Sequence, residues 1–313
     1  MDLVFCGTPE FAVPTLDRLV EAGHILRLVV TQPDRPRGRG LDVAASPVKR
    51  RAEALRLPAV QPDKIKNNAG FREQLESLRP QAIIVVGYGR LIPKWMIDLP
   101  PHGNLNLHAS LLPKYRGTAP VQWAIASGET VTGVTTMRID EGLDTGDILL
   151  QRALPIARDD TAETLAPRLA MLGADLMADT LRGLEAATIE PRPQAHEHAT
   201  LAPLLKKEDG LIDFAKTARE VHNRLRGFQP WPGVYSMFRG KNLAIHRARV
   251  VESASAIVPG ELRVEGERLL VGCGQGTALE LLEVQPEGKK RMPAGDFLHG
   301  YRPQPGEPLG AAA

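Results

Sequence analysis

The chain has 313 residues, enough for two domains with hydrophobic cores. Hydrophobic residues make up 43% of it and charged residues 24%, which is typical of a folded globular protein and excludes a mostly disordered one. The formal net charge is only +2, too small for a protein that binds nucleic acid over its whole surface.

The chain carries no sign of export or of membrane insertion. Met1 and Asp2 lead directly into an apolar segment without a signal-peptide pattern, and no apolar run reaches the roughly 18 residues of a membrane span. Cys6 and Cys273 lack the spacing of metal ligands, which favours two buried thiols. We therefore expect a cytoplasmic protein with neither a disulfide nor a bound metal.

Short apolar segments alternate with amphipathic helical patterns in the first part of the chain, as a parallel sheet with crossover helices requires. The expected strands are 3–6, 25–31, 82–86, 104–108, 133–139 and 148–153. The expected helices are 11–22, 47–55, 70–78, 121–127 and 161–185. This order predicts an α/β domain over residues 1–188, built on a doubly wound, mostly parallel sheet.

Prolines and a lack of apolar residues mark residues 189–205 as a linker to a second domain. A basic helix is expected at 217–226, and short strands punctuated by glycine follow at 233–238, 242–250, 262–264, 269–272 and 278–284. Such spacing predicts a small β-barrel of the oligonucleotide-binding (OB) type over residues 206–313. The stretch from Lys216 to Arg249 contains eight Lys or Arg residues and only one acidic residue, Glu220, so this domain could bind phosphates.

The strand expected at 104–108 carries polar side chains where a central strand should be apolar. Alternation places Asn104, Asn106 and His108 on one face. Because both faces of a parallel sheet are normally covered, these groups would lose water without obvious partners. Ligands of open α/β sheets bind beyond the carboxyl ends of strands, so we interpret Asn106 and His108 as site residues. The alternative is a hydrogen-bonded Asn and His that only make the core rigid.

Two loops are candidates for the rest of the site. Residues 110–120 read SLLPKYRGTAP, and residues 142–147 read GLDTGD with Asp144 between two glycines. Loops that present polar groups above a rigid sheet commonly carry catalysis. Asp144 could equally be a turn-forming residue.

A basic insertion follows the second expected strand. Residues 34–51 contain Lys49, Arg50 and Arg51 together with an arginine loop flanked by glycine, whose members are Arg35, Arg37 and Arg39. Such a loop suits the phosphates or splayed bases of an RNA end. The alternative is that these charges are simply solvated.

These segments resemble the folate-dependent formyltransferases. The strand ending in Asn106-Leu107-His108, the SLLPKYRGTAP loop and the GLDTGD loop resemble the signature of that family. Further stretches resemble the branch that acts on methionyl-tRNA, namely Gly7-Thr8-Pro9-Glu10-Phe11, Thr31-Gln32-Pro33-Asp34-Arg35-Pro36, Pro230-Trp231-Pro232 and Gly288-Lys289-Lys290-Arg291. The resemblance runs from the first strand to about Arg291.

The resemblance implies a Rossmann-like catalytic domain in which Asn106, His108 and Asp144 transfer the formyl group of 10-formyltetrahydrofolate to the amino group of methionyl-initiator tRNA, without a metal. The folate is expected against Gly87, Tyr88, Ser110, Leu111, Leu112 and Pro113. Arg39 falls where the related enzymes contact the acceptor stem. Further phosphate contacts are expected from Lys206, Lys207, Lys289, Lys290 and Arg291, although the Lys-Lys-Arg turn could equally serve solubility. We expect the enzyme to be a monomer.

Two other functions stay open at this point. A formyltransferase that acts on a sugar nucleotide or a purine precursor would need the same three catalytic residues, but not the arginine loop. A non-catalytic RNA-binding protein would leave the polar stripe on the central strand unexplained.

Overall fold

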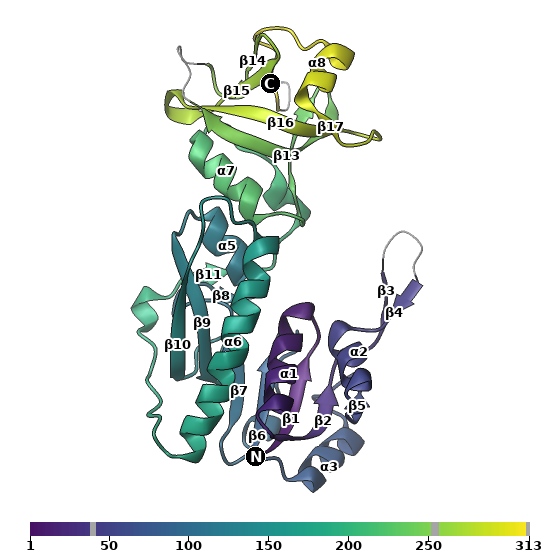
Figure 1. The fold of residues 1–313 in the computed structure, drawn as a ribbon, viewed down its shortest axis with the longest axis vertical. Coiled ribbons are helices and arrows are strands. Elements are labelled where there is room, and N and C mark those ends of the chain that lie inside the picture. The colour runs from purple at the N-terminus through teal and green to yellow at the C-terminus, as the bar shows by residue number, and fades with distance from the viewer. Residues whose placement is uncertain (38–41, 252–256, 311–313) are drawn as a thin grey trace. The chain divides into compact units, whose positions relative to one another are not determined.

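The computed structural model describes residues 1–37, 42–251 and 257–310, which form two compact units (Figure 1). Unit 1 comprises Met1–Pro120, Val131–Pro155 and Ala166–Ala202. Unit 2 comprises Val121–Thr130, Ile156–Leu165 and Pro203–Ala313.

Unit 1 is built on a seven-stranded sheet with the order β10-β9-β7-β6-β1-β2-β5. The strands are β1 (Asp2–Gly7), β2 (Ile25–Val30), β5 (Ala59–Val60), β6 (Ala82–Val86), β7 (Asn104–His108), β9 (Val131–Arg138) and β10 (Ile148–Pro155). The five neighbouring strands β5, β2, β1, β6 and β7 are parallel to one another, whereas β9 runs antiparallel to β7 and to β10. The predicted doubly wound, mostly parallel sheet is confirmed. The sequence did not predict β5, because a strand of two residues is too short to show an alternation of apolar and polar side chains.

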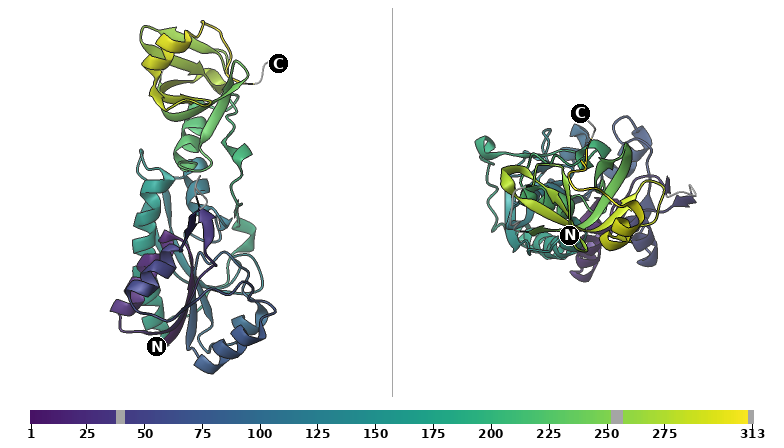
Figure 2. Two further views of the ribbon diagram at one scale, coloured as in Figure 1. Left: turned by 90° about the vertical axis from the view of Figure 1, so that its right-hand side faces the viewer. Right: turned by 90° about the horizontal axis from the view of Figure 1, so that it is seen from above.

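Helices cover both faces of this sheet, as the side view in Figure 2 shows. They are α1 (Val13–Glu21), which follows the 3-10 turn Glu10–Ala12, α2 (Pro47–Ala54), α3 (Ala69–Leu78), α4 (Lys94–Ile97) and most of α6 (Ala162–Glu185). Phe71 of α3 and Met96 of α4 pack on one face, against Val4, Ile83 and Val85. On the opposite face, α6 approaches β7.

The contact between α6 and β7 depends on a glycine. A Cβ atom on Gly173 of α6 would lie 2.6 Å from Cδ2 of Leu107, closer than real Cβ contacts allow. Leu107 therefore faces α6, and the neighbouring Asn106 and His108 face the other side of the sheet, as the alternation predicts.

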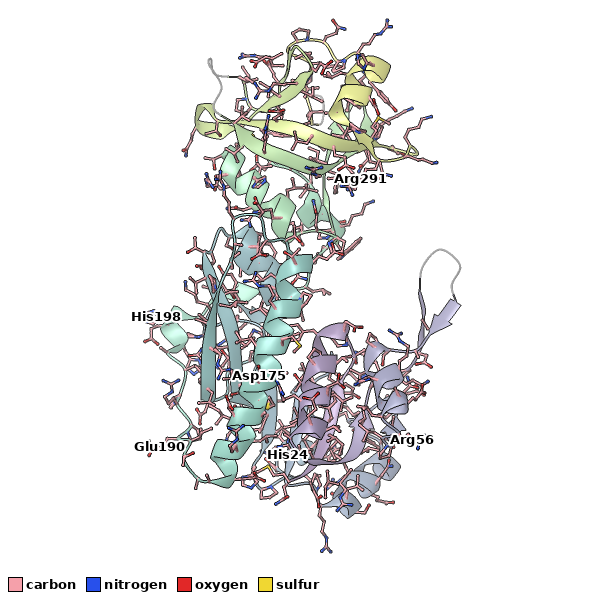
Figure 3. The ribbon with its side chains drawn as sticks, viewed as in Figure 1. His24, Arg56, Asp175, Glu190, His198 and Arg291 are labelled. Atoms are coloured by element: carbon pink, nitrogen blue, oxygen red, sulfur yellow. The ribbon has the colours of Figure 1, made fainter. Side chains whose placement is uncertain are left out.

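Several short elements connect the main ones. Strands β3 (Arg35–Arg37) and β4 (Asp42–Ala44) form an antiparallel hairpin, and β8 (Arg116–Gly117) pairs in parallel with β11 (Leu201–Ala202). A 3-10 turn spans His196–His198. Glu190 and His198, labelled in Figure 3, mark the segment before β11.

Unit 2 contains an antiparallel sheet with the order β12-β13-β16-β15-β14. Its strands are β12 (Val234–Phe238), β13 (Lys241–Val251), β14 (Leu262–Glu265), β15 (Arg268–Gly272), β16 (Ala278–Pro286) and β17 (Met292–Pro293), which pairs with β16. Its helices are α7 (Ala218–Gly227), α8 (Ala294–Tyr301) and most of α5 (Pro120–Ala126), with 3-10 turns at Lys207–Gly210 and Gly274–Gly276.

The end of the chain touches both edges of this second sheet. Leu309 bridges to Phe238 at the end of β12, and Pro308 bridges to Glu261 beside β14. A C-terminal segment that meets both edge strands is compatible with the expected OB-like barrel, and full closure stays a prediction.

Among the described residues, no helix is both long enough and apolar enough to cross a membrane.

The Gly173 contact gives a test of how tightly α6 backs the polar strand. Gly173→Ala should lower the free energy of unfolding by about 1–3 kcal/mol, because overpacking against the buried Leu107 outweighs the gain in helix propensity of about 1 kcal/mol. Urea unfolding would measure the change. The matched control is Gly70→Ala in α3, whose new Cβ meets nothing closer than 3.9 Å and which should stabilise the protein. Equal effects of the two substitutions would contradict the tight contact.

Candidate active site

The polar stripe on β7 consists of Asn104, Asn106 and His108. The first is a structural residue, and the other two face the candidate site. Asn104 is 1% exposed, and its Nδ2 donates to the carbonyl oxygens of Met96 at 2.7 Å and Ile97 at 3.1 Å. It ties β7 to the end of α4. Asn104 therefore fits the alternative stated above, a hydrogen-bonded Asn that only makes the core rigid.

Asn106 differs from Asn104 in having no such anchor. Its side chain is half-buried, and no hydrogen bond to its amide is found among the residues that the structure describes. An amide in this position retains two N–H donors and a carbonyl acceptor for a ligand.

His108 lies between two oxygen acceptors. The residue is 6% exposed, with Nε2 2.8 Å from the carbonyl oxygen of Tyr115 and Nδ1 3.7 Å from Oδ2 of Asp144. When Nε2 donates to Tyr115, a neutral ring presents the lone pair of Nδ1 to the carboxylate, whereas a protonated ring offers an N–H to each oxygen. The ring thus lies between a carbonyl oxygen and a carboxylate oxygen.

Asp144 reaches His108 from a loop that folds over the same face of the sheet. Its Oδ2 accepts a 2.8 Å hydrogen bond from the N–H of Gly117, and its backbone has φ 52°, a left-handed conformation that Asp tolerates. The turn-forming role belongs to Asp140, whose Oδ1 accepts from the N–H of Gly142 and from Oγ1 of Thr145. The Asp144 carboxylate is thus directed to the site.

Thr135 anchors the loop that contains Ser110, Leu111, Leu112 and Pro113. This residue of β9 is fully buried and donates to the carbonyl oxygen of Ser110 at 2.6 Å. It accepts from the N–H of Leu112 at 3.2 Å and from Nε2 of Gln151 at 3.0 Å. Gln151 also donates to the carbonyl oxygen of Leu112 at 2.8 Å. Neither Thr135 nor Gln151 was predicted, because a polar residue in a strand gives no sign of the loop it will hold.

The end of β6 contributes backbone groups more than side chains. Tyr88 is 1% exposed within the apolar cluster of α3 and α4, where burial raises the pKa of its hydroxyl. Its carbonyl oxygen accepts from Nε2 of Gln32 at 2.8 Å. Gly87 is exposed with φ 55°, and a Cβ there would lie 2.8 Å from Cγ of Pro9. A ligand at this end of the sheet would meet the main chain.

The basic insertion forms the β3–β4 hairpin, whose base is fixed by an ion pair. Lys49 Nζ lies 2.5 Å from Oδ2 of Asp34, and Gln61 donates to Oδ1 at 2.6 Å. These hydrogen bonds, the one from Lys49 first, hold the pKa of Asp34 below its usual range. Arg35 and Arg37 lie on β3, whereas the predicted contact Arg39 lies outside the described residues.

The predicted basic contacts of unit 2 fall into two kinds. Lys206, Lys207, Lys289 and Lys290 are exposed, and no ion pair is found for them within the described part of the chain. Arg291, labelled in Figure 3, is bound to Glu283, with Nε 2.5 Å from Oε1 and Nη2 2.6 Å from Oε2. This pairing lowers the pKa of Glu283.

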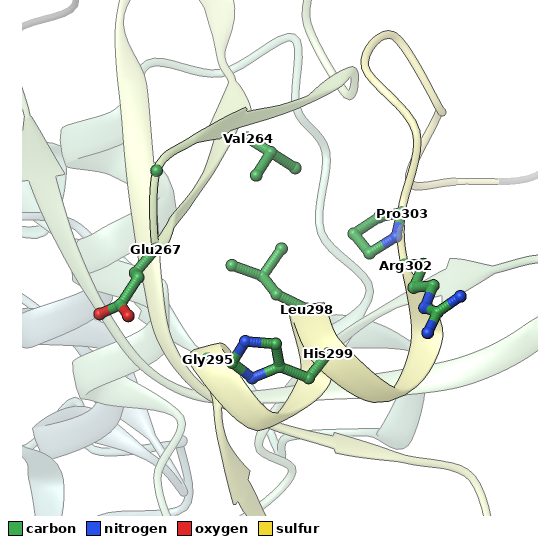
Figure 4. Close-up of a pocket in the computed structure, with 8 residues that line it drawn as sticks. Val264, Glu267, Gly295, Leu298, His299, Arg302 and Pro303 are labelled. Carbon is green, nitrogen blue, oxygen red and sulfur yellow. The ribbon is translucent and has the colours of Figure 1, made fainter.

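Two surface cavities contain none of the predicted residues. One, of about 200 Å³, is lined in unit 2 by Val264, Gly266, Glu267, Gly295, Leu298, His299, Arg302 and Pro303 (Figure 4). The other, of about 490 Å³, lies in unit 1 between Arg18, Arg152 and Arg182, whose charges are already paired with Glu21, Asp175 and Asp179. Hydrogen-bond geometry at β7 identifies the site better than cavity size does. Among the described residues, no group of His, Cys, Asp or Glu is placed to hold a metal.

Comparisons with known proteins cover both units. Residues 1–181 match the Formyl transferase family, and residues 204–302 match the Formyl transferase C-terminal domain. The chain is 66% identical to the methionyl-tRNA formyltransferase of Koribacter versatilis, over 99% of each chain. It is 61% identical to the enzyme of that name from Acidobacterium capsulatum, over 99% of this chain and all of the other.

Solved structures share the fold at lower identity. An N-formyltransferase from Helicobacter canadensis, in complex with folinic acid and dTDP-3-aminofucose, matches with TM-score 0.66 and 20% identity, over 91% of this chain and 98% of the other. HypX from Aquifex aeolicus, in complex with tetrahydrofolic acid, matches with TM-score 0.61 and 19% identity, over 95% of this chain and 46% of the other.

The role of Thr135 as an anchor can be measured by an isosteric change. Thr135→Val should lower the free energy of unfolding by about 1–3 kcal/mol, because it leaves the N–H of Leu112 and the carbonyl of Ser110 without their buried partner. The same change at Thr132, which is buried in the same strand and whose hydroxyl has no hydrogen bond to any described residue, should have little effect. Chemical unfolding of both variants tests this, and similar losses would contradict the assignment.

Proposed function

The chain belongs to the formyl transferase family, in the branch of the methionyl-tRNA formyltransferases, and on this premise we propose that it transfers the formyl group of 10-formyltetrahydrofolate to the α-amino group of methionyl-initiator tRNA. The observation that carries this proposal is the 66% identity over 99% of both chains, which includes unit 2 as well as the sheet. Likeness to the sugar-directed enzyme is limited to the fold, at 20% identity.

In the proposed reaction, the neutral amine forms a bond to the formyl carbon, and the carbon–nitrogen bond to the folate then breaks. The formyl oxygen becomes negatively charged in between, so the site must offer donors to that oxygen. The unpartnered amide of Asn106 can donate to it, and so can the Nδ1–H of a protonated His108. The 3.7 Å between Nδ1 and Asp144 is longer than a hydrogen bond, which leaves this N–H available to the formyl oxygen.

Asp144 is assigned the handling of the proton. The attacking nitrogen carries a proton that it must lose, and the departing folate nitrogen gains one, so no net proton is consumed. A free α-amino group titrates at about 7.7–8.0, so a sizeable fraction is already neutral near pH 7 and little base strength is needed. The Asp144 carboxylate, held by the N–H of Gly117, stabilises the His108 cation and relays the proton.

The carboxyl ends of β6 and β7 are the expected place for the flat folate ring. We assign its binding to the Ser110–Pro113 loop together with Gly87 and Tyr88. The loop is held rigid by Thr135 and Gln151, which supports a preformed slot. At Gly87 and Tyr88 the contact would come from the main chain, because the Tyr88 side chain is buried.

The tRNA contacts are assigned to cations on each unit, of which the lysines of unit 2 are exposed. In unit 1 these are Arg35, Arg37 and Arg39 of the hairpin segment. In unit 2 they are Lys206, Lys207, Lys289 and Lys290, with Arg291 held by Glu283 as a support of the same turn. Exposed lysines bind phosphates with little sequence preference, which suits an acceptor stem.

We further propose that residues 1–188 carry catalysis and folate binding, that 206–313 bind tRNA as an OB-like domain, and that 189–205 join them. The family matches at 1–181 and 204–302 support this division. The proposed enzyme acts in the cytoplasm as a monomer without a metal.

One assay tests the function. The full chain is incubated with 10-formyltetrahydrofolate and methionine-charged initiator tRNA, and in parallel with an amino-sugar nucleotide and with a purine-precursor amine. Formyl mass is expected on the tRNA-bound methionine. Formylation of a small amine instead would replace the proposal, and tRNA binding without any formylation would indicate a non-catalytic protein.

Asn106→Ala should lower kcat on the order of a hundredfold to a thousandfold, the usual cost of one oxyanion donor. Asn106→Asp keeps the shape but replaces the donor with a negative charge, so it should be at least as slow. The control is Asn67→Ala, an exposed amide far along the chain from the site loops, with unchanged activity expected. Full activity of both Asn106 variants would remove the amide from the mechanism.

Lys290→Ala should weaken the use of tRNA and reduce the slope of log(kcat/KM) against log salt by about one, because one phosphate contact is lost. Arg291→Ala should reduce the slope less and lower stability, since it leaves Glu283 unpaired. KM for the folate should stay constant in both variants. Lys66→Ala, an exposed cation to which no tRNA contact is assigned, serves as the control. An unchanged slope in Lys290→Ala would exclude a contact there.

A further inference from the structure

We infer that Gln194 and Arg116 form a buried bridge that positions the Asp144 carboxylate against His108. This inference rests on the proposed function and adds two positioning residues to it. Gln194 comes from the proline-rich segment that composition marks as a linker, more than forty residues beyond the Asp144 loop.

Gln194 holds the main chain at Asp144 and two residues beyond it. The residue is 4% exposed, and its Nε2 donates to the carbonyl oxygen of Asp144 at 3.0 Å and to that of Gly146 at 2.7 Å. One side-chain amide thus uses both of its N–H groups on the same turn. The turn cannot shift without breaking one of these hydrogen bonds.

Arg116 fixes the orientation of that amide. It is 7% exposed, and its Nε and Nη2 donate to Oε1 of Gln194 at 3.1 Å and 2.7 Å. A reversed amide would set its NH2 against the guanidinium donors and its oxygen against two carbonyl oxygens. Hydrogen bonds from a charged donor are stronger than those between neutral groups, so the amide is strongly held.

The same short strand that carries Arg116 touches both catalytic partners. The carbonyl oxygen of Tyr115 accepts from His108, and the N–H of Gly117 donates to Asp144. Backbone pairing with β11 fixes this strand, since the N–H of Arg116 donates to Thr200 at 2.8 Å. A Cβ on Gly117 would lie 2.7 Å from the carbonyl oxygen of Ala202, so this pairing requires glycine.

The bridge therefore closes a ring of contacts. His108 and Asp144 each bind the segment Tyr115–Gly117 directly, and Gln194 ties the Asp144 turn to the same segment through Arg116. Without the bridge, the carboxylate would be positioned only by the hydrogen bond from Gly117 and by the turn that Asp140 stabilises. A displacement of about 1 Å can cost about a hundredfold in rate, so the bridge should matter for turnover.

The main test is Gln194→Leu, which keeps the volume and removes every hydrogen bond of the bridge. We expect kcat for tRNA formylation to fall about tenfold to a hundredfold, with KM for folate and for tRNA within about twofold of wild type. Gln74→Leu, the same change at an exposed position of α3, is the matched control and should leave kcat unchanged.

A second variant separates positioning from simple loss of structure. Gln194→Glu keeps the acceptor for Arg116 but sets a carboxylate against the carbonyl oxygens of Asp144 and Gly146. Protonation of this new carboxyl restores one donor. The ratio of variant to wild-type kcat should therefore rise as pH falls, whereas damage unrelated to these hydrogen bonds gives a ratio that does not change with pH.

The outcomes are distinguishable. If the wild-type chain does not formylate methionyl-tRNA, the proposed function fails. If it does, and both Gln194 variants melt like wild type and turn over like Gln74→Leu, the bridge has no positioning role. A pH-independent ratio for Gln194→Glu, or a loss confined to KM, overturns the inference as well. If Gln194→Leu does not fold, the pH profile of Gln194→Glu decides the question.

Discussion

The site depends on the desolvation of polar side chains on a buried central strand. Removing an amide and an imidazole from water costs free energy that partners must offset. On β7 the Nδ2 group of Asn104 binds the end of α4, although its Oδ1 has no partner among the described residues, and the ring of His108 lies between a carbonyl and a carboxylate. Asn106 differs in that neither end of its amide has a partner in the described part of the chain, and such an amide beside a buried imidazole can serve a substrate oxygen.

The surrounding elements keep this arrangement rigid. Because β9 runs antiparallel to β7, with Thr135 opposite His108 and Met137 opposite Asn106, the next loop leaves at the amino end of β7 and must fold back over the face to bring Asp144 to His108. A loop that returns over such a distance needs anchors. Gly117, Gln194 and Asp140 supply them for the Asp144 turn, and Thr135 and Gln151 supply them for the Ser110–Pro113 loop.

Among the basic side chains, two kinds can be distinguished, those held in ion pairs and those that are exposed at the surface. The net charge of the chain is only +2, so attraction to RNA must be local. Lys49 and Arg291 are committed to Asp34 and Glu283 and hold their segments in shape. The exposed lysines of unit 2 keep their charge available. In the Lys-Lys-Arg turn, Arg291 is ion-paired, whereas its neighbour Lys290 is exposed and has no ion pair among the described residues.

Local patterns sufficed to predict the longer strands of both units, since alternation and apolar runs depend on near neighbours in the chain. The strands of two or three residues, β3, β4, β5, β8, β11 and β17, are too short to show such a pattern. The stripe Asn104, Asn106 and His108 was readable for the same reason, and family resemblance added Asp144. Nothing local separates Asn104 from Asn106, because their difference lies in what α4 brings near. Nor could composition reveal that Gln194 and Arg116 meet, or that Thr135 holds a loop, because these contacts join segments far apart in the chain. The periodicity of side chains can be read from the sequence, because it depends only on the order of residues. The partners of buried polar atoms are decided only when folding brings distant strands and loops together.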